Sequence, residues 1–592
     1  MSTTNISASE VSEESKVETI KSVISHDDYK KIKKPSISKL FLKRVFDICS
    51  SAVAILILLP FFLFFTPIVA IIMKGNPFFV QKRVGKNGKI FNILKYRTMT
   101  NGKDKEGNLL PDKDRLTKLG KFLRATSIDE LPELLNIFTG QMSVVGPRPL
   151  LRVYFPFYSA EQLQRHMVRP GLTGLAQISG RNNITWEQKI EYDLEYINKL
   201  NFLYDLKIIF MTIAKVLKKD DVVVQGSSQI KEFYDEWVLP ENLMEKEIGS
   251  SFVFGAENKG NGLRVVTDKK NLTLVNSGRN AIKVVLQQEK VKKAFIPIFT
   301  CESVIKAFVD EGIEIEYYDV DKQLNIKKGL YKKISLQKNK SIVYLQNYFC
   351  SYNLDGVKKK LKKYKNVVVV EDITHSMLDN RKFVNADYYV GSIRKWAGVW
   401  EGGIVFSNSD IVIETASDNC LVDKLTNVAA LQKEYYLNGK LEIKKIFREK
   451  LSDIEHIFDF KETQSIAQQT KQLMECVDFE NIAKIRKENY YNLGLMLTEF
   501  NVVKPIFEID VGKSVPLYFP VYADDREKLQ KYFCENKIYC PIIWPKSNFA
   551  VENCNSEADY IYKHILCFPI DQRYNIDDMK KIFKVLEEYS KG

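Results

Sequence analysis

The sequence predicts an α/β protein of at least two domains with one hydrophobic membrane helix near its N-terminus. The chain has 592 residues, more than a single hydrophobic core usually serves. A stretch of 26 residues without a charge, 48–73, is long enough to enter a bilayer. From residue 263 onward, short β-branched runs such as AFIPI and NVVVVED alternate with amphipathic segments, which is typical of helices layered on a buried sheet.

Composition narrows the class of partner. The net charge is +14 and the pI is near 9.0, but the lysines are spread along the chain and no nucleic-acid-binding motif is present. We therefore expect no nucleic acid, and instead an anionic membrane surface or phosphate-bearing substrates. In the C-terminal half the lysines could equally serve solubility alone. Nine scattered cysteines without a C-x-x-C pair favour a reducing, cytoplasmic setting over a zinc or disulfide framework.

The N-terminal region divides into a tail and a membrane helix. Residues 1–36 are polar and predict a disordered tail. Within 48–73, Pro60 and Pro67 would break the helix, and each half is too short to cross the roughly 30 Å hydrocarbon core. Basic residues on both sides favour the cytoplasm for both ends. We expect a re-entrant helix that enters and leaves one leaflet; the alternative is a kinked spanning helix.

The rest of the chain reads as two α/β regions. Residues 78 to about 220 form the first, and its last segment, 202–218, predicts a helix that lies either on the membrane or against the domain core. Residues 223–262 are polar and glycine-rich, as in a linker between domains. The second α/β region runs over 263–592.

The first candidate site is the segment SIDELPELLN. Ser127 and Glu130 have capping-box spacing, which would place Asp129 and Glu130 in the first turn of a helix. These acids could simply complement the helix dipole, or the dipole could lower the Asp129 pKa and keep a nucleophile ionised. Cations that could neutralise a diphosphate surround them in the sequence: Lys95, Arg97, Arg124, Arg148, Arg169 and Arg181.

Several motifs in this region occur together in a known family. The segments KRVFD, NILKYRTM, SIDELPELLNIFTGQMSVVGPRPLL, VRPGLTGLAQISGRN and FLYDLKIIF closely resemble the monotopic bacterial phosphoglycosyl transferases. The resemblance covers about residues 39–222, and we take 37–222 as the domain. It implies transfer of a phospho-sugar from a UDP-sugar to polyprenyl (undecaprenyl) phosphate with release of UMP, in glycoconjugate or exopolysaccharide biosynthesis.

The resemblance also implies residue roles. Asp129 would form a covalent phospho-sugar intermediate, and Glu130 would act as base or share Mg²⁺ with it. The substrate phosphates and nucleotide would be held by Lys95, Arg97, Arg124, Arg148 and Arg181. The enzyme would sit monotopically in the inner (cytoplasmic) membrane with its catalytic domains on the cytoplasmic side.

The second candidate site follows buried strands. NVVVVED ends in Glu371 and Asp372, at the strand end where α/β folds bind ligands, and Lys395 follows another apolar run. By itself Lys395 is more often a surface lysine. However, NSGRNAI, VVEDITHS, GSIRKWAGVWEGG and FPIDQRYNIDDMKKI resemble the DegT-type sugar aminotransferases, which have the type I pyridoxal-phosphate fold.

This second resemblance implies a cofactor site. Lys395 would form the Schiff base with pyridoxal 5'-phosphate, Asp372 would pair with the ring nitrogen, and His375 would lie near the phenolic oxygen. Ser277 and Gly278 would bind the phosphate. Two positions depart from the family: Cys301 stands where an aromatic residue often stacks on the ring, and Val390 replaces a phosphate-binding Ser, for which Ser392 could substitute.

Together the two resemblances imply a bifunctional membrane enzyme. An aminotransferase, with an amino donor such as glutamate, would supply a UDP-amino-sugar to the transferase, and the chain would form a homodimer. The alternative is an active transferase joined to a non-catalytic aminotransferase-like domain for dimerisation or substrate binding.

Overall fold

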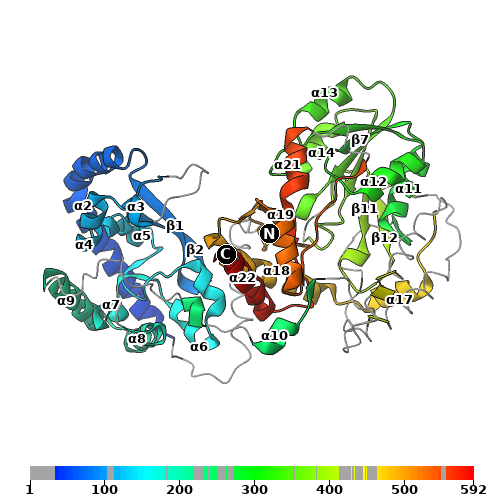
Figure 1. The fold of residues 1–592 in the computed structure, drawn as a ribbon. Helices are drawn as coiled ribbons and strands as arrows, with labels where there is room; N and C mark the ends of the chain where they lie inside the picture. The colour runs from blue at the N-terminus through cyan, green and yellow to red at the C-terminus, as the bar shows by residue number, and fades with distance from the viewer. Residues whose placement is uncertain are drawn as a thin grey trace, which may run out of the picture. The chain divides into compact units, whose positions relative to one another are not determined.

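The computed structural model divides the chain into two compact units, Met1–Val238 and Leu239–Gly592, here unit 1 and unit 2. The structure describes residues 32, 34–102, 112–180, 184–218, 233–236, 240–249, 262, 271–350, 354–379, 381, 383–399, 401–411, 429, 432–433, 445–446, 448–449, 463–548 and 555–591. Figure 1 shows a helix-rich unit 1 and a unit 2 built around a large sheet. Both are α/β, as predicted.

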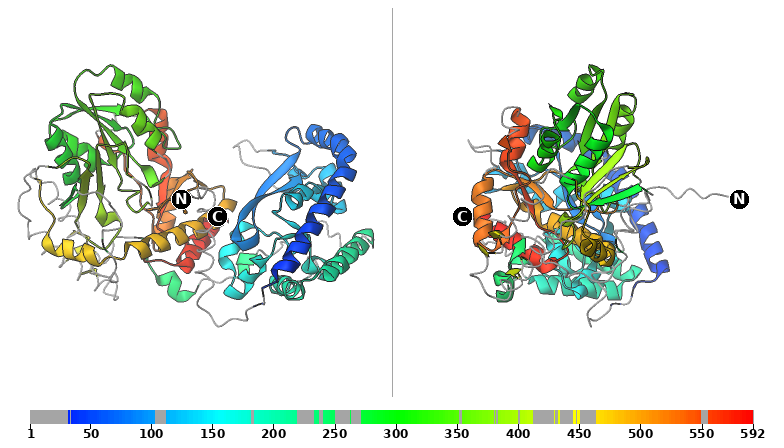
Figure 2. Two further views of the ribbon diagram at one scale, coloured as in Figure 1. Left: turned by 180° about the vertical axis from the view of Figure 1, so that it is seen from behind. Right: turned by 90° about the vertical axis from the view of Figure 1, so that its right-hand side faces the viewer.

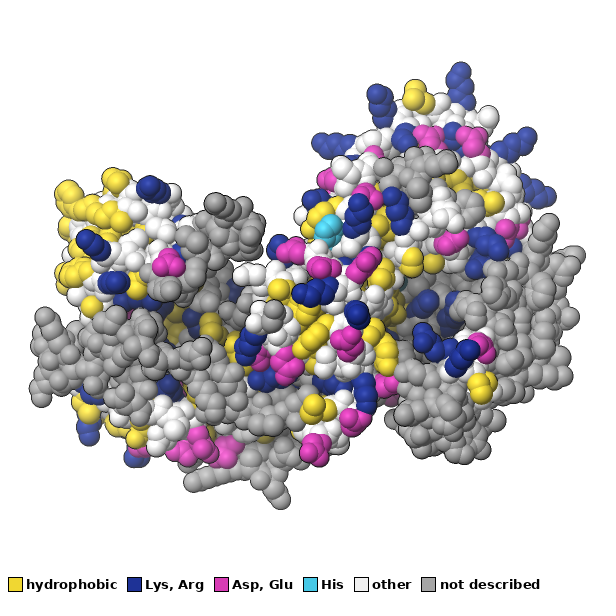
Figure 3. Space-filling view, in the orientation of Figure 1, with side chains coloured by type: hydrophobic (Ala, Val, Ile, Leu, Met, Phe, Trp, Pro, Cys, Tyr) yellow, Lys and Arg dark blue, Asp and Glu magenta, His cyan; other side chains and the backbone are white. Residues whose placement is uncertain are grey.

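The first element of unit 1 is the long helix α2 (Ile37–Ile72), which contains both Pro60 and Pro67. The helix continues through both prolines, although neither has a backbone N–H to donate to the preceding turn, and Figure 2 shows the helix axis turning along its length. Its apolar face is largely uncovered: Leu56 and Phe64 are 72% and 79% exposed, and Figure 3 shows apolar side chains gathered over α2. In the described part of the chain, α2 is the one helix that is long enough and apolar enough to cross a membrane.

Both halves of α2 pack against the same α/β unit. Near its start, the Lys43 ammonium contacts the buried Asp205 carboxylate at 2.7 Å, and Asp47 accepts hydrogen bonds from Ser143 Oγ and Val144 N at 2.9 Å. Near its end, the Thr66 hydroxyl lies 2.8 Å from that of Tyr96. Lys43 and Asp47, both in the KRVFD motif, therefore attach the start of the helix to the rest of unit 1.

The rest of unit 1 consists of short elements. An antiparallel hairpin joins β1 (Phe78–Val84) to β2 (Ile90–Tyr96), and β3 (Ser143–Val145) pairs in parallel with β4 (Gly171–Thr173). The helices and 3-10 turns are η1 (Lys86–Gly88), α3 (Asp112–Arg115), α4 (Lys118–Thr126), η2 (Ile128–Glu130), α5 (Glu133–Phe138), η3 (Arg152–Phe157), α6 (Ala160–Leu163), η4 (Gln164–Met167), α7 (Leu175–Ser179), α8 (Trp186–Lys199), α9 (Phe202–Lys218) and η5 (Phe233–Glu236).

The predicted helix over 202–218 is present as α9. One face packs on the core through Asp205 and Ile208, which are buried. Its other face exposes apolar side chains, including Leu203 and Phe210. The helix thus shows features of both predicted alternatives, since it contacts the domain core and also leaves an apolar face open.

Unit 2 has a seven-stranded sheet with the order β6-β12-β11-β10-β9-β7-β8, in which β12 alone runs antiparallel. Its strands are β6 (Asn271–Val275), β7 (Lys293–Pro297), β8 (Glu314–Tyr318), β9 (Ser341–Gln346), β10 (Val367–Asp372), β11 (Tyr388–Ser392) and β12 (Gly403–Ser407). Alternate residues of β10 enter opposite cores, with Val368 on one face and Val369 on the other. This explains why the run is apolar throughout.

Helices cover both faces of this sheet (Figure 1). The core of one face includes residues of α11 (Gly278–Glu289) and α12 (Glu302–Asp310), and the core of the other includes residues of α13 (Gly329–Ser335) and α14 (Asp355–Leu361). The chain also forms two 3-10 turns beside the sheet, η7 (Tyr348–Cys350) and η8 (Ile393–Lys395).

A smaller part follows near the C-terminus. Its antiparallel sheet orders β13 (Val503–Pro505), β14 (Phe519–Ala523) and β16 (Ile565–Phe568). Near it lie α18 (Phe479–Met496), η9 (Leu497–Glu499), α19 (Arg526–Glu535), α21 (Ser556–His564) and α22 (Ile576–Lys591). The preceding helix, α17 (Gln468–Cys476), lies near β12 of the large sheet (Figure 1).

The predicted tail, 1–36, and the predicted linker, 223–262, lie partly outside the described residues. Within the expected tail, Ile32 is described and buried, and its N–H donates to Gln164 Oε1 at 2.7 Å. Within the expected linker 223–262, α10 (Glu241–Glu245) and β5 (Ile248–Gly249) belong to unit 2. There β5 pairs in parallel with β15 (Ile538–Tyr539). The start of unit 2 is therefore structured before residue 263.

Candidate active sites

The acidic pair of unit 1 lies in the 3-10 turn η2, not in the first turn of an α-helix. Ser127 adopts a left-handed conformation with φ of 55°, and its side chain makes no capping hydrogen bond. The capping-box prediction was wrong because Pro132 delays the α-helix until Glu133, so a tight turn joins α4 to α5. The turn holds Asp129 and Glu130 between two helices.

Glu130 lies at the centre of a charged cluster. Its Oε1 atom is 2.8 Å from Lys95 Nζ and 3.0 Å from Arg148 Nη2. Burial raises the Glu130 pKa, but Arg148 and Lys95 more than offset this and hold the pKa at about 2. Glu130 is therefore ionised at neutral pH.

The cluster has a third acid, Glu133, which the sequence reasoning missed. Its Oε1 atom lies 3.1 Å from the same Lys95 Nζ, and its side chain is 3% exposed. Burial, together with the charge of Glu130, raises the Glu133 pKa to about 7. Its spacing of three residues after Glu130 was the available signal, since such residues fall on the same side of a helix or turn.

Asp129 differs from the prediction in its charge state. Burial and the neighbouring Glu130 carboxylate raise its pKa to about 6, against the opposing effects of Lys95 and Arg124. The expected lowering by a helix dipole was wrong because no α-helix begins at this residue. Asp129 is still mostly ionised above pH 6, and desolvation makes such a carboxylate more reactive.

The other arginines predicted to bind phosphate make different contacts from those of Lys95 and Arg148. Arg124 extends from α4, is exposed, and donates from Nε to Thr98 Oγ1 at 3.1 Å. Arg97 follows β2, and its backbone N–H donates to the Pro77 carbonyl. Arg169 donates to the Gly140 carbonyl at 2.7 Å, away from the acids. Arg181 lies outside the described residues.

The Arg148 loop is supported by close backbone packing. A Cβ atom on Gly171 would lie 2.1 Å from the Gly146 nitrogen, and one on Gly174 would lie 2.2 Å from the Gly146 carbonyl oxygen. The motifs around VVGPRP and RPGLTG therefore require glycine to bring β3 and β4 together. Arg148 itself stays accessible, with 47% of its side chain exposed.

A magnesium ion would find oxygen ligands here. Among the described residues no cluster of three or more His, Cys, Asp and Glu side chains is arranged to hold a metal. Mg²⁺ commonly takes only one or two carboxylates and completes its shell with water and substrate phosphates. Asp129 and Glu130 supply such a pair, so the residues present fit the implied ion.

In unit 2, the predicted cofactor residues gather at the carboxyl edge of the large sheet. Ser277 caps α11 by accepting the Asn280 N–H at 3.2 Å, and Gly278 lies against Ser392 at the end of β11. The start of α11 thus presents backbone N–H groups beside Ser392, as a phosphate would require. Val390, where the family has a serine, is buried within β11.

Asp372 ends β10 as a buried carboxylate. Its Oδ2 accepts from Tyr344 Oη at 2.6 Å and its Oδ1 from Thr374 N at 2.8 Å. Burial raises its pKa, and among the described residues it forms no ion pair. A protonated ring nitrogen would provide the missing positive partner, so Asp372 fits a pyridine cofactor.

His375 and Lys395 lie close to one another. Burial and the Lys395 charge lower the His375 pKa to about 3, so the imidazole is neutral. The ring stacks on Trp544 with centroids 5.4 Å apart, and its buried Nδ1 has no hydrogen-bond partner within the described part of the chain. Lys395 is exposed at the end of η8. Sequence reasoning assigned no role to Trp544, which comes from the C-terminal part of unit 2.

Glu371, beside Asp372, has a structural role. It is fully buried and contacts Lys358 Nζ at 2.7 Å and Arg381 Nη2 at 2.7 Å. Cys301 caps α12 after β7, and its Sγ lies 3.1 Å from Ser303 Oγ.

Comparison with known proteins identifies the class of unit 1. The sequence profile of the bacterial sugar transferase family matches residues 38–219. The uncharacterised sugar transferase EpsL of Bacillus subtilis is 48% identical over 184 residues, which are 31% of this chain and 91% of that protein. The chain belongs to the bacterial sugar transferase family, and the first resemblance is confirmed.

A further relative is longer than the matching region. The UDP-glucose:undecaprenyl-phosphate glucose-1-phosphate transferase of Klebsiella pneumoniae is 41% identical over 186 residues, which are 30% of this chain and 40% of that protein. The similarity thus covers only part of the relative. It falls within unit 1 of this chain.

Unit 2 has sugar aminotransferases among its structural neighbours. DesV of S. venezuelae aligns with a TM-score of 0.42 and 13% identity, covering 56% of this chain and 87% of DesV. A DegT DnrJ EryC1 StrS aminotransferase from Brucella abortus aligns with a TM-score of 0.40 and 13% identity, covering 55% and 87%. The function proposed below for unit 2 depends on its own residues.

Proposed function

We propose that unit 1 transfers a phospho-sugar from a UDP-sugar to polyprenyl phosphate through a covalent intermediate on Asp129. The observation that carries this proposal is the pairing of Asp129 with a strongly ionised Glu130 beside Lys95 and Arg148. A nucleophilic carboxylate next to cations is what attack on an anionic diphosphate requires.

The reaction divides into two displacements at one phosphorus. An Asp129 carboxylate oxygen bonds to the phosphorus that carries the sugar, and the bond from that phosphorus to UMP breaks, so UMP leaves with the electron pair. A phosphate oxygen of polyprenyl phosphate then attacks the same phosphorus and releases Asp129. Lys95 and Arg148 bind the equatorial oxygens, where charge accumulates. Mg²⁺ held by Asp129 and Glu130 would neutralise further phosphate charge.

The proposed membrane arrangement is monotopic and cytoplasmic. It is supported by the contacts of both ends of α2 with one unit, through Lys43 and Asp47 at the start and Thr66 near the end. A helix that crossed the bilayer straight would carry its two ends to opposite sides. The exposed apolar face of α2 would lie in one leaflet, with the reaction at the membrane surface.

We further propose that unit 2 is a pyridoxal-phosphate aminotransferase acting on a UDP-keto-sugar with an amino donor such as glutamate. The supporting observation is the buried Asp372, which has no ion-pair partner in the described part of the chain and lies at the sheet edge that also bears Ser277, Ser392 and Lys395. When bound, pyridoxal phosphate supplies an electron sink for amino-group transfer. Lys395 would hold and release the cofactor, and neutral His375 would position its ring.

The transferase proposal is tested by trapping the intermediate. Incubation with UDP-sugar radiolabelled in the sugar, without polyprenyl phosphate, should label the protein, and peptide mapping should place the label on Asp129. An Asp129→Asn variant should remain unlabelled, whereas Asp114→Asn, in the adjacent α3, should label normally. A wild-type chain that releases UMP without acquiring label would contradict the covalent mechanism.

The aminotransferase proposal needs a separate measurement. The full-length protein with added pyridoxal phosphate should show the visible absorbance of the lysine-bound cofactor, and Lys395→Ala should abolish it while UMP release persists. Lys332→Ala, on α13, is the matched control. A wild-type spectrum without this absorbance would favour the alternative, a non-catalytic module for dimerisation or substrate binding.

A further inference from the structure

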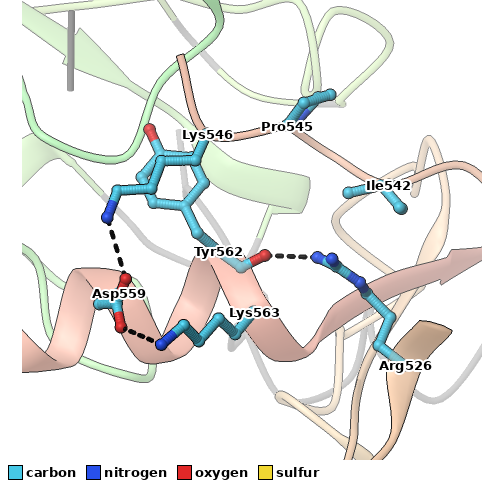
Figure 4. Close-up of a pocket in the computed structure, with 7 residues that line it drawn as sticks. All are labelled: Arg526, Ile542, Pro545, Lys546, Asp559, Tyr562 and Lys563. Atoms are coloured by element: carbon cyan, nitrogen blue, oxygen red, sulfur yellow. Dashed lines mark hydrogen bonds and ion pairs between the residues drawn. The ribbon is translucent and has the colours of Figure 1, made fainter. Parts of the chain in front are cut away.

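A second concave site lies in unit 2, beside α21. The cavity has a volume of about 460 Å³ and is lined by Arg526, Ile542, Pro545, Lys546, Asp559, Tyr562 and Lys563. Figure 4 shows these side chains arriving from three segments: the start of α19, the chain after β15, and one face of α21. None of them belongs to the cofactor residues described above. A cavity of this size suits a small organic ligand.

The lining carries an excess of positive charge. Asp559 pairs with both lysines, through Oδ1 to Lys546 Nζ at 3.0 Å and through Oδ2 to Lys563 Nζ at 2.8 Å. Arg526 adds a third cation at the other end of the lining, so the lining has three positive groups and one carboxylate. The cavity therefore has a net charge of about +2, and the lysines are already aligned on a single anion.

Arg526 is the most constrained of these cations. Its side chain is 13% exposed, and its guanidinium donates to the Tyr562 carbonyl oxygen. Its Nε is buried and has no hydrogen-bond partner among the described residues. The Arg526–Glu527 pair is loose at 3.7 Å, and Glu527 is 87% exposed. A partly buried guanidinium with unused donor capacity is suited to a phosphate ligand.

The opposite part of the lining is apolar. Ile542 and Pro545 contribute hydrocarbon, and Tyr562 is held rigidly because its hydroxyl donates to the Ile298 carbonyl at 2.9 Å and accepts from Thr300 N at 3.2 Å. A small dicarboxylate would satisfy the charge but leave this apolar wall uncovered. A ligand with both a divalent negative group and a ring system would cover both parts.

We propose that this cavity binds a pyrophosphate diester, the chemical class of nucleotide-sugars. Such a ligand carries two negative charges, which match the net charge of the lining, and its ring systems fit the wall formed by Ile542, Pro545 and Tyr562. The inference depends on the cavity alone and does not require the aminotransferase activity proposed above.

The experiment measures local hydrogen exchange in the full-length protein. UDP-glucose is the probe, and an Asp129→Asn background prevents its consumption by unit 1. The expected result is slower exchange in residues 556–564 of α21 and in residues 541–547. Adding Arg526→Gln and Lys563→Gln should abolish this protection and weaken binding there by at least about tenfold. A Lys528→Gln/Lys531→Gln pair, on α19 and outside the lining, should retain it.

Unit 1 provides an internal control, because protection near the 118–130 segment reports on its own nucleotide-sugar site. Protection that persists in α21 after Arg526 and Lys563 are both replaced would overturn the proposal, as would no protection there at saturating probe. Inorganic pyrophosphate should compete for the α21 site, whereas effective competition by glutamate would also overturn it. If unit 1 alone remains unprotected, the transferase proposal fails while the α21 result can still be read.

Discussion

Lys95 Nζ lies 3.1 Å from Glu133 Oε1 while it also contacts Glu130, so one ammonium serves two carboxyl groups. The two acids do not share it equally. The second cation, Arg148, contacts Glu130, which stays ionised, and the Glu133 pKa rises to about 7. Glu133 therefore changes its charge close to physiological pH, next to the proposed nucleophile.

Lys95→Met should destabilise unit 1 in a pH-dependent way. At pH 8 both Glu130 and Glu133 are ionised and lose their shared cation, at a cost of about 2–4 kcal/mol. At pH 5 Glu133 already holds a proton in the folded state, so the cost should be smaller. Denaturant unfolding of the solubilised protein at both pH values measures this. Lys95→Met/Glu133→Gln should regain part of the loss at pH 8, and an equal loss at both pH values would refute the coupling.

The rate of phospho-sugar transfer should fall as the pH drops below about 6. Asp129 must be ionised to attack phosphorus, and its pKa is raised to about 6, so each further unit of acidification should cost about tenfold. Initial rates of UMP release, measured across the pH range, give the pH–rate profile and its acidic limb, the part where the rate falls with decreasing pH.

Arg124→Gln should move the acidic limb of the pH–rate profile to higher pH, because Arg124 lowers the Asp129 pKa. The shift should be only about half a pH unit, because Arg124 is exposed and solvent screens its charge. Lys121→Gln, exposed on the same helix α4 but not among the groups that shift Asp129, should leave the profile unchanged. A limb that stays in place for Arg124→Gln would show that another group controls the rate.

Asp129→Asn should abolish transfer yet stabilise unit 1 at neutral pH. The carboxyl pKa is about 6 in the folded chain against 3.8 ordinarily, so its favourable contribution is complete below about pH 4 and is lost as the pH rises through 6. At pH 7 the amide should therefore gain about 1–3 kcal/mol, and at pH 4 almost nothing. Unfolding without magnesium measures both, and a variant less stable than the wild type at pH 7 would contradict the burial of this charge.

Gly171→Ala should disturb the Arg148 loop. Its Cβ would lie 2.1 Å from the Gly146 nitrogen, so β3 and β4 must separate, at a cost of about 3 kcal/mol. Transfer should fall mainly through a raised KM, because Arg148 is displaced. Gly356→Ala, in α14 with no atom within 4 Å of the new Cβ, should be neutral or slightly stabilising. Unfolding and steady-state kinetics of UMP release distinguish the two variants.

The strongest sequence patterns predicted the elements correctly. The apolar run of β10 and the mixed apolar and basic pattern of α9 gave the right type of structure, because periodicity reports directly on which faces are buried. The capping box at Ser127 failed because the same spacing also fits a 3-10 turn, and Pro132 selected the turn. The spacing after Glu130 could have drawn attention to Glu133, but nothing in its local sequence shows that Lys95, on strand β2, reaches it.

Residue types and their spacing along the chain were enough to predict the sugar transferase family, the apolar helix and the candidate reactive side chains. The charge states of those side chains could not be predicted in this way, because they depend on the folded structure. Groups distant in sequence contribute to the pKa values of Asp129 and Glu133 and to the set of cations around α21. They also bury Asp372, which has no ion-pair partner among the described residues. Burial and Coulomb energies depend on distance in space, which local sequence does not specify.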